Sequence, residues 1–373
     1  MTRAIAFIMG TRPEIIKLAP VIEALSRSRI LRPLIISSGQ HELMAQQAFS
    51  TFKLKPDINL RLMTDNQTPN SFLSRLLEQL GSHLSSLELG GCIVQGDTTT
   101  TLGGALTAFH HKLPLAHIEA GLRTYRMDSP FPEEMNRVVV SRMAQLHFCP
   151  TQTARDNLAS EGITQNVFTT GNTVVDAALA VDARFASNDL TLDPALAQLA
   201  SHQRRLVLVT GHRRENFDGP LESLCRVLKE IRDKIQDIEI VYPVHLNPKV
   251  TATVNRVLRN ETRINLIPPV DYPSLIWLIK HAVLIISDSG GIQEEAPSFG
   301  VRVLVTRSTT ERPEAIGAGC AILAPLEDPE KLLQLALSEL AAARTAANQK
   351  LSNPFGDGHA AARIVKILEE HWG

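Results

Sequence analysis

Short, continuously apolar runs alternate with longer amphipathic segments along nearly the whole chain. The pattern begins with the runs Ala4–Met9 and Pro33–Ser37, which flank the amphipathic segment Glu14–Ser26. Apolar runs without polar alternation are typical of parallel strands that helices cover on both faces. The repeated order of strand and helix therefore predicts an α/β fold with doubly wound parallel sheets. The other strand-like runs are Cys92–Gln95, Pro114–Ile118, Leu146–Cys149, Val167–Thr170, Leu206–Thr210, Ile238–Tyr242, Ile264–Ile267, Val283–Ser287, Val301–Val305 and Cys320–Leu323.

The strand–helix series is interrupted in the polar, Ala-rich stretch Val181–Gln203. A chain of 373 residues is long enough for two domains. We therefore predict one α/β domain over residues 1–180 and a second over residues 201–355, joined by this stretch. Two similar halves that face one another would leave a cleft for a ligand between them.

The charge and cysteine content exclude several classes of protein. Lys and Arg number 38 and Asp and Glu 39, so no overall basic field favours nucleic acid or a membrane surface as partner. No apolar stretch reaches transmembrane length, and the N-terminus lacks the pattern of a signal peptide. The four cysteines are widely spaced, which is typical of a reduced, cytoplasmic protein rather than a disulfide framework.

Polar and glycine-rich segments follow the predicted strands. Gly10–Glu14 follows the first strand, Gly96–Thr98 follows another, and Asp288–Gly291 follows a strand of the second half. In open α/β sheets, ligands bind beyond the carboxyl ends of the strands. The sequence therefore predicts a ligand site at this edge of each sheet.

The segment Asp288–Glu295 leaves a predicted strand and enters a helix with two adjacent glycines. Unhindered backbone N–H groups at such a place can hold a diphosphate. A carboxylate one turn into the helix can accept hydrogen bonds from ribose hydroxyls, and Arg12, Lys17 and Arg312 can add positive charge around a phosphate. A plain strand-to-helix turn is the alternative interpretation of the glycines on their own.

Several common cofactor and catalytic motifs are missing. The first strand is not followed by G-x-G-x-x-G, so a bound nicotinamide cofactor is not supported, and neither a P-loop nor a G-x-S-x-G elbow is present. The adjacent His110 and His111 point to different sides of a helix end, which is a poor arrangement for a metal. We therefore expect neither a metal nor a cofactor.

Three acidic residues follow predicted strands of the first half: Asp97, Glu119 and Glu133. Carboxylates that cluster in a cleft raise one another's pKa and can divide into an acid and a base near neutral pH. Three exposed loop acids are the alternative. Glycines and the nearby Arg123 and Arg137 favour a packed polar site instead.

These motifs, in their order, resemble the non-hydrolysing UDP-N-acetylglucosamine 2-epimerase family. The resemblance runs from GTRPEIIKLAPVI (Gly10–Ile22) through QGDTTTT, HIEAGLRT, PFPEEMNR, TGHRREN and PVHLNP to DSGGIQEEAPSFG and TTERPEA (Thr309–Ala315). It implies two Rossmann-like domains of the glycosyltransferase-B type facing a central cleft, with the catalytic carboxylates in the first and UDP bound to the second. It also implies that a final helix, residues 356–373, returns to the first domain, and that the enzyme is a homodimer.

The resemblance assigns roles to residues that match the family's functional positions. Catalysis is assigned to Asp97, Glu119, Glu133 and His212. Binding of the UDP-sugar is assigned to Arg12, Lys17, Arg137, His245, Val270, Leu275, Ser289, Gly290, Gly291, Glu295 and Arg312.

One departure from the family pattern concerns activation by a second molecule of UDP-GlcNAc. Bacterial relatives hold that molecule partly with residues after Gln-His and with an Arg in a D-R-Q segment. Here Asn66 occupies the place of this Arg, and Leu43 lies in the segment after Gln-His. These substitutions put the activation in doubt.

The implied reaction interconverts UDP-GlcNAc and UDP-ManNAc by inverting C2. Without a redox cofactor, elimination of UDP to a bound 2-acetamidoglucal, followed by re-addition, is the sensible route. This route needs an acid and a base on opposite faces of the sugar and a firm hold on the released UDP. A hydrolysing epimerase, an epimerase of a modified UDP-sugar, a glycosyltransferase of the same architecture and a catalytically inactive sensor remain alternatives.

Overall fold

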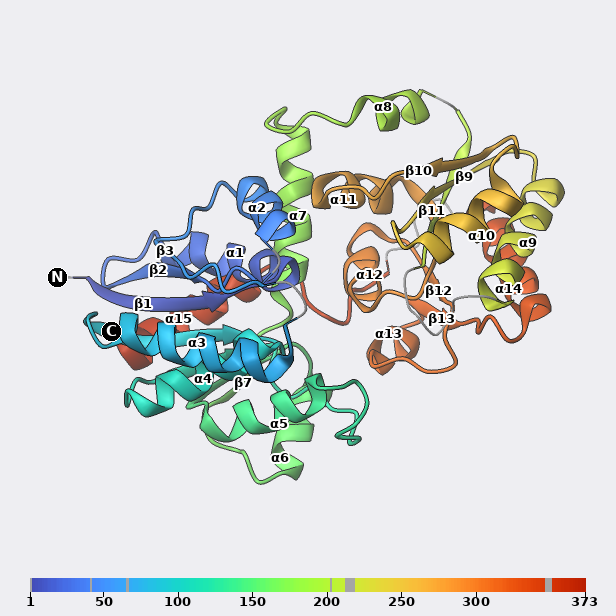
Figure 1. Ribbon diagram of the computed structural model, residues 1–373. Coiled ribbons are helices and arrows are strands. Elements are labelled where there is room, and N and C mark those ends of the chain that lie inside the picture. Colours follow the sequence, from blue (N-terminus) through green and yellow to red (C-terminus); the bar gives the residue numbers. More distant parts are fainter. Residues whose placement is uncertain (1, 41, 65–66, 202, 212–218, 346–350) are drawn as a thin grey trace. The chain divides into compact units, whose positions relative to one another are not determined.

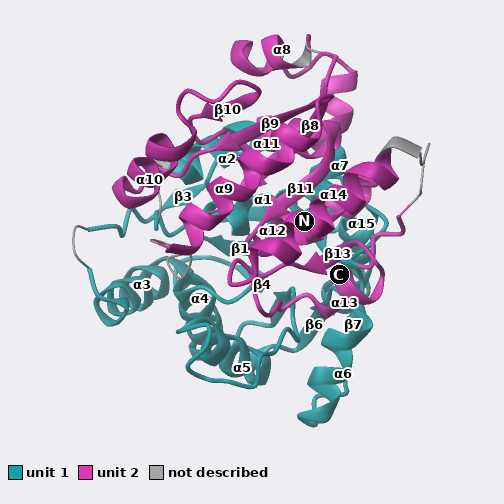
Figure 2. Ribbon diagram, turned by 90° about the vertical axis from the view of Figure 1, so that its right-hand side faces the viewer, with its two compact units in different colours: residues 1–180, 355–373 teal, residues 181–354 magenta. Residues whose placement is uncertain are grey.

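The computed structural model describes the chain except residues 1, 41, 65–66, 202, 212–218 and 346–350. The chain divides into two compact units (Figure 2). Unit 1 contains residues 1–180 and 355–373, and unit 2 contains residues 181–354. Helix α7 (Thr173–Ala186) begins in unit 1 and ends in unit 2.

Unit 1 contains a parallel sheet in the order β3-β2-β1-β4-β5-β6-β7. Its strands are β1 (Arg3–Met9), β2 (Leu31–Ser37), β3 (Ile58–Asn59), β4 (Leu89–Gln95), β5 (Leu115–Ile118), β6 (Leu146–Cys149) and β7 (Val167–Thr169). Its other helices are α1 (Arg12–Leu25), α2 (Glu42–Thr51), α3 (Pro69–Leu84), α4 (Thr99–His110), α5 (Glu133–Met143), α6 (Gln152–Ser160) and α15 (Ala360–Trp372).

Unit 2 contains a second parallel sheet, in the order β10-β9-β8-β11-β12-β13. Its strands are β8 (Arg205–Thr210), β9 (Ile238–Pro243), β10 (Ile264–Ile267), β11 (Ala282–Ser287), β12 (Val303–Val305) and β13 (Ala321–Leu323). Its helices are α8 (Pro194–Ala200), α9 (Gly219–Lys234), α10 (Pro248–Leu258), α11 (Tyr272–His281), α12 (Gly290–Glu295), α13 (Pro313–Gly317) and α14 (Pro329–Thr345), with a 3₁₀ turn at Ala296–Phe299.

Each sheet has one point at which the strand order reverses. In unit 1 the reversal lies between β1 and β4, and in unit 2 it lies between β8 and β11. In open α/β sheets, ligands bind at such a point, beyond the carboxyl ends of the strands. Gly10–Glu14 and Gly96–Thr98 follow β1 and β4, and Asp288–Gly291 follows β11. The unusual segments of the sequence therefore lie at the reversal points.

The structure differs from the sequence prediction in several local details. The two-residue strand β3 has no counterpart among the predicted strands, since two residues are too short to show a period. The polar stretch after Val181 contains the end of α7 and the short helix α8. Glu133, predicted to lie in a loop, is the first residue of α5. Its position in a first helical turn suits a carboxylate, because the helix dipole is positive there.

The C-terminal helix α15 packs against unit 1, where Figure 1 shows it beside α1. Its first backbone N–H groups, at Ala360 and Ala361, donate to the buried Asp176 carboxylate at 3.2 and 2.8 Å. At its other end, the Arg3 guanidinium donates to the carbonyl oxygen of Trp372 at 2.7 Å. A helix start capped by a side chain from a distant segment anchors the C-terminus to this unit.

We predict that Asp176→Ala destabilises unit 1 by about 0.5–2 kcal/mol, the usual range for a lost helix cap. Two buried helix N–H groups would lose their acceptor. Chemical denaturation and hydrogen exchange of the α15 amides measure the effect. The exposed Asp193, which caps α8 through the Ala195 N–H, provides a matched control. The Asp193→Ala variant should lose less folding stability than Asp176→Ala. Equal stability of the Asp176→Ala variant and the wild type would contradict this role.

Candidate active site

Glu14 joins the loops that follow β1 and β4. Its carboxylate is buried and accepts hydrogen bonds from the Gly10 N–H at 3.1 Å, the Thr11 N–H at 2.7 Å and the Thr98 hydroxyl at 2.7 Å. The Thr11 contact is part of the capping box that starts α1. The sequence predicts no individual role for Glu14, which is only one residue of the Gly10–Glu14 segment. Its capping-box spacing was the available signal, whereas its bond to Thr98 spans 84 residues.

The Glu119 carboxylate receives three hydrogen bonds from three different segments. Lys17 Nζ donates to Oε1 at 2.5 Å, Asn172 Nδ2 donates to the same oxygen at 3.2 Å, and Gln95 Nε2 donates to Oε2. Glu119 has a φ of +65°, a left-handed conformation that is costly for a residue other than glycine. Gln95 and Asn172 were not predicted as site residues. Lys17, predicted to contact phosphate, lies against a carboxylate.

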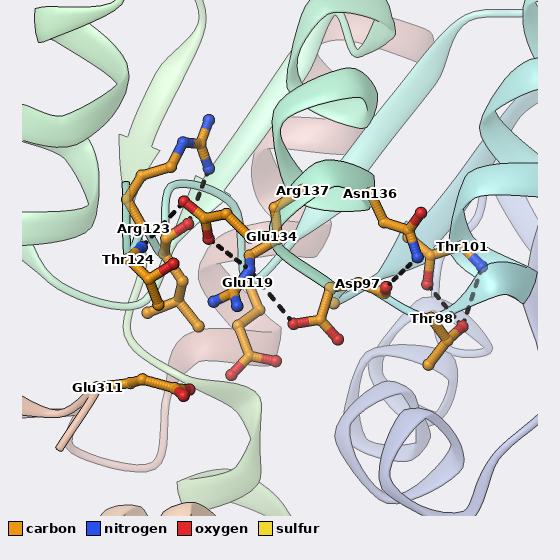
Figure 3. Close-up of polar contacts among 12 residues, drawn as sticks. Asp97, Thr98, Thr101, Glu119, Arg123, Thr124, Glu134, Asn136, Arg137 and Glu311 are labelled. Atoms are coloured by element: carbon orange, nitrogen blue, oxygen red, sulfur yellow. Dashed lines mark hydrogen bonds and ion pairs between the residues drawn. The ribbon is translucent and has the colours of Figure 1, made fainter. Parts of the chain in front are cut away.

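Asp97 and Glu134 lie on either side of the buried Arg137 side chain (Figure 3). Arg137 Nε lies 3.5 Å from Asp97 Oδ2 and 3.3 Å from Glu134 Oε2. The other oxygen of Glu134 accepts the N–H groups of Thr124 and Tyr125, both at 2.9 Å. Arg137 Nε and Nη2 have no hydrogen-bond acceptor within the part of the chain that the structure describes. A buried guanidinium in this state can donate a hydrogen bond to an oxygen of a ligand.

The surroundings of Asp97 favour its protonated form. Burial raises the pKa of Asp97 to about 6, and the negative charges of Glu119 and Glu133 act in the same direction, whereas Arg137 and Lys17 oppose it. The side chain is still 30% exposed, so a substrate can reach it. A carboxyl group with this pKa exchanges a proton readily near neutral pH.

Glu133 lies close enough to Asp97 to raise its pKa. Its Oε2 atom is buried and has no hydrogen-bond partner among the described residues. The structure therefore brings Lys17, Asp97, Glu119, Glu133 and Arg137 into one cluster in unit 1. The sequence predicts that the three acids lie beside Arg137, but it places Lys17 at a phosphate.

Two other polar residues of this region are structural. Arg123 donates to both oxygens of Glu161, at 2.6 and 2.9 Å, so it does not contribute to the carboxylate cluster. His117 is fully buried, with Nε2 2.7 Å from the carbonyl oxygen of Gly96, and burial lowers its pKa to about 3. A neutral imidazole at this place stabilises the turn before Asp97.

In unit 2, Ser289 is the residue before α12, and Gly290 and Gly291 form the first turn of this helix. The Arg312 guanidinium lies close to Gly290, where an added Cβ would be 3.5 Å from Cζ. Arg312 Nε donates to Glu294 Oε1 at 2.7 Å. Arg312 Nη1 also donates to Glu311 Oε2 at 3.2 Å. The turn thus places the first backbone N–H groups of a helix beside a guanidinium, an arrangement that can hold a diphosphate.

The remaining predicted ligand contacts differ in their accessibility. Glu295 is buried and accepts a hydrogen bond from the Tyr272 hydroxyl at 3.0 Å. His245 is exposed, and Val270 and Leu275 are half-buried around the start of α11. Arg12 is the first residue of α1 and is half-buried. His212, Asn66 and the side chain of Leu43 lie outside the described residues.

Comparison with known proteins identifies the family. A family model described as UDP-N-acetylglucosamine 2-epimerase matches residues 23–369. The UDP-N-acetylglucosamine 2-epimerase of Yersinia pestis is 43% identical over 98% of each chain. The chain belongs to the UDP-N-acetylglucosamine 2-epimerase family.

Solved structures agree with this assignment. The Neisseria meningitidis UDP-GlcNAc 2-epimerase, crystallised with UDP-GlcNAc, has a TM-score of 0.89 and 36% identity, and the match covers 99% of this chain and all of that one. The glycosyltransferase of kitacinnamycin, at 12% identity and a TM-score of 0.64, shares the fold alone. The predicted family and the fold class of two Rossmann-like parallel sheets are confirmed.

The described residues form neither a metal site nor a membrane-spanning helix. Among the described residues, no group of three or more His, Cys, Asp or Glu side chains has an arrangement suited to a metal ion. None of the helices in the described ranges combines the length and apolar character needed to cross a bilayer.

We predict that the stability of the Asp97→Asn variant, compared with that of the wild type, increases as the pH rises. The pKa of Asp97 is about 6 in the folded protein and 3.8 ordinarily, so the folded state binds this proton more tightly than the unfolded chain. The contribution of this pKa difference to the stability of the folded state is fully present below pH 3.8 and is lost as the pH rises through about 6. The amide does not titrate. The melting temperature of Asp97→Asn relative to wild type should therefore increase between about pH 4.5 and about pH 7.5.

Differential scanning fluorimetry across this range measures the effect. The matched control is Asp156→Asn, since Asp156 is an exposed aspartate of the same unit. The difference in melting temperature between Asp156→Asn and the wild type should stay constant across this pH range. A constant difference for Asp97→Asn as well would contradict the proposed environment of this carboxyl group.

Proposed function

We propose that this chain catalyses the reversible C2 epimerisation of UDP-GlcNAc to UDP-ManNAc without hydrolysing the nucleotide. The observation that carries the proposal is the carboxylate cluster of Asp97, Glu119 and Glu133 at the reversal point of a sheet in a member of this family. The Neisseria relative, whose crystal structure contains UDP-GlcNAc, supports the choice of sugar nucleotide.

The proposed reaction proceeds by elimination and re-addition. One carboxylate removes the C2 proton while the C1–O bond to UDP breaks, and the electron pair of the C2–H bond forms the C1–C2 double bond of a 2-acetamidoglucal. An acid then protonates C2 from the opposite face, and a β-phosphate oxygen of UDP attacks C1. Asp97, with a pKa near 6, is suited to either transfer, because both of its protonation states are populated near neutral pH.

The proposal also assigns the contacts of the sugar nucleotide to individual residues. The N–H groups of Gly290 and Gly291, which begin α12, and the guanidinium of Arg312 suit the diphosphate. Arg137 Nη2, which has no hydrogen-bond acceptor among the described residues, can donate to an oxygen of the sugar. His212 is assigned to catalysis by resemblance. The other proposed contacts are Arg12, Lys17, His245, Val270, Leu275 and Glu295.

The setting of the enzyme also belongs to the proposal. A cytoplasmic location agrees with four cysteines that are all buried and unpaired. A homodimer is what the family resemblance implies. No nucleic acid or membrane partner and no cofactor are part of the proposed activity.

Epimerisation in heavy water tests the mechanism. Because C2 loses its proton and regains one from an exchangeable group, the product should carry deuterium at C2, as NMR detects. Free hexosamine, measured in parallel, should stay low, because UDP is recaptured. Product that retains the C2 proton would reject elimination, and mainly free ManNAc would identify a hydrolysing epimerase. No reaction without an acceptor would favour a glycosyltransferase or a sensor.

Replacing Asp97, Glu119 or Glu133 by the corresponding amide should reduce turnover by ~10²–10⁴, the usual contribution of a general acid or base. Affinity for UDP should be retained, because the proposed diphosphate site at Gly290, Gly291 and Arg312 belongs to unit 2, whereas the three acids belong to unit 1. Coupled assays and calorimetry measure the two quantities. Asp156→Asn, the exposed control, should keep wild-type turnover. Near-native rates in all three amide variants would show that the cluster is not catalytic.

A further inference from the structure

Asn172, between β7 and α7, bonds three parts of unit 1 at once. Its side-chain Nδ2 donates to Glu119 Oε1 at 3.2 Å, and its Oδ1 accepts the Val174 N–H at 3.1 Å. Its backbone N–H donates to the carbonyl oxygen of Phe355 at 2.6 Å. The residue is 3% exposed, so these bonds are shielded from water.

Phe355 is the residue at which the chain returns from unit 2 to unit 1. The returning segment lies directly against the segment that carries Asn172. A Cβ atom at Gly171 would lie 3.4 Å from the Phe355 carbonyl oxygen, and one at Gly356 would lie 3.5 Å from Asn172 N. Both glycines have positive φ angles, +91° and +144°. Backbones in such contact move together, because no flexible side chain separates them.

Glu119 depends on its neighbours for its orientation. Its left-handed backbone is held by its surroundings rather than by its own preference. Lys17 supplies positive charge to the carboxylate, whereas Gln95 and Asn172 supply neutral, directional hydrogen bonds. Asn172 is the donor that also bonds the returning segment.

We propose that Asn172 is a positioning residue for the reaction: it sets the orientation of the Glu119 carboxylate from the point where the chain returns to unit 1. This role rests on the proposed function, in which Glu119 is a catalytic carboxylate. It makes the geometry of that carboxylate dependent on the position of Phe355. Asn172 itself needs no contact with the sugar nucleotide.

The variant Asn172→Asp tests the role with little change in shape. It keeps an oxygen for the Val174 N–H and leaves the backbone bond to Phe355 intact, but it replaces the donor to Glu119 by a negative charge. Turnover should fall by about 10- to 100-fold, the scale of a misplaced catalytic group. The KM and the affinity for UDP should stay at wild-type values, since none of the residues proposed to bind UDP is bonded to Asn172 Nδ2.

A reciprocal exchange tests the contact without relying on activity. In the double variant Asn172→Asp with Glu119→Gln, the new amide at position 119 can donate to the new carboxylate at position 172. The melting temperature should therefore fall less when Asn172→Asp is introduced into Glu119→Gln than into the wild type. Turnover stays lost in the double variant, because the catalytic carboxylate is absent. Asn166→Asp, an exposed change of the same kind in unit 1, should affect neither turnover nor melting temperature.

The outcomes separate this inference from the proposed function. Wild-type turnover in Asn172→Asp, or an equal loss of melting temperature in both backgrounds, would overturn the positioning role. A wild-type protein that does not epimerise UDP-GlcNAc would instead reject the proposed function, and with it a role in this reaction. Lower turnover at constant KM, together with stability recovered in the double variant, would establish the role.

Discussion

The burial of the Glu14 carboxylate is the constraint on which the geometry of the candidate site depends. A carboxylate in an apolar interior is stable only when hydrogen bonds replace its water, and burial alone raises the pKa of Glu14. Its donors come from Gly10 and Thr11 after β1 and from Thr98 after β4. The need to satisfy one side chain therefore brings together the two loops that flank the reversal point of the sheet. Asp97 lies directly before Thr98, so its position follows from the same bonds.

The carboxylate cluster beyond these loops holds like charges close together, which is unfavourable for stability. Burial raises the pKa of Asp97 to about 6, and the negative charges of Glu119 and Glu133 add to this effect, whereas Arg137 and Lys17 oppose it. A core optimised for stability would neutralise such a group or expose it. Arg137 is likewise buried with N–H groups that lack an acceptor among the described residues. Both features are what a site needs if it is to exchange a proton with a substrate and bind one of its oxygens.

The two units offer complementary chemistry. Unit 1 presents acidic and cationic side chains in a hydrogen-bonded network. In this network Glu119 accepts hydrogen bonds from α1, from β4 and from the segment before α7. Unit 2 presents the backbone N–H groups of Gly290 and Gly291 beside Arg312, which suits a polyanionic group with little need for proton transfer. An elimination that expels UDP requires both kinds of surface, one for the sugar carbon and one for the leaving group.

The sequence by itself determined the order of strands and helices, the fold class and the segments that carry chemistry. It did so because continuous apolar runs and glycine-rich turns can be recognised from short stretches of neighbouring residues. The family resemblance added the predicted catalytic roles of Asp97, Glu119 and Glu133. Only the tertiary structure decided which side chains share a hydrogen bond. Lys17 pairs with Glu119 across 102 residues, and Arg123 pairs with Glu161 rather than joining the acids. Gln95 and Asn172 carry no local signal of their contact with Glu119, because that contact is set by how distant strand ends meet at one edge of a sheet.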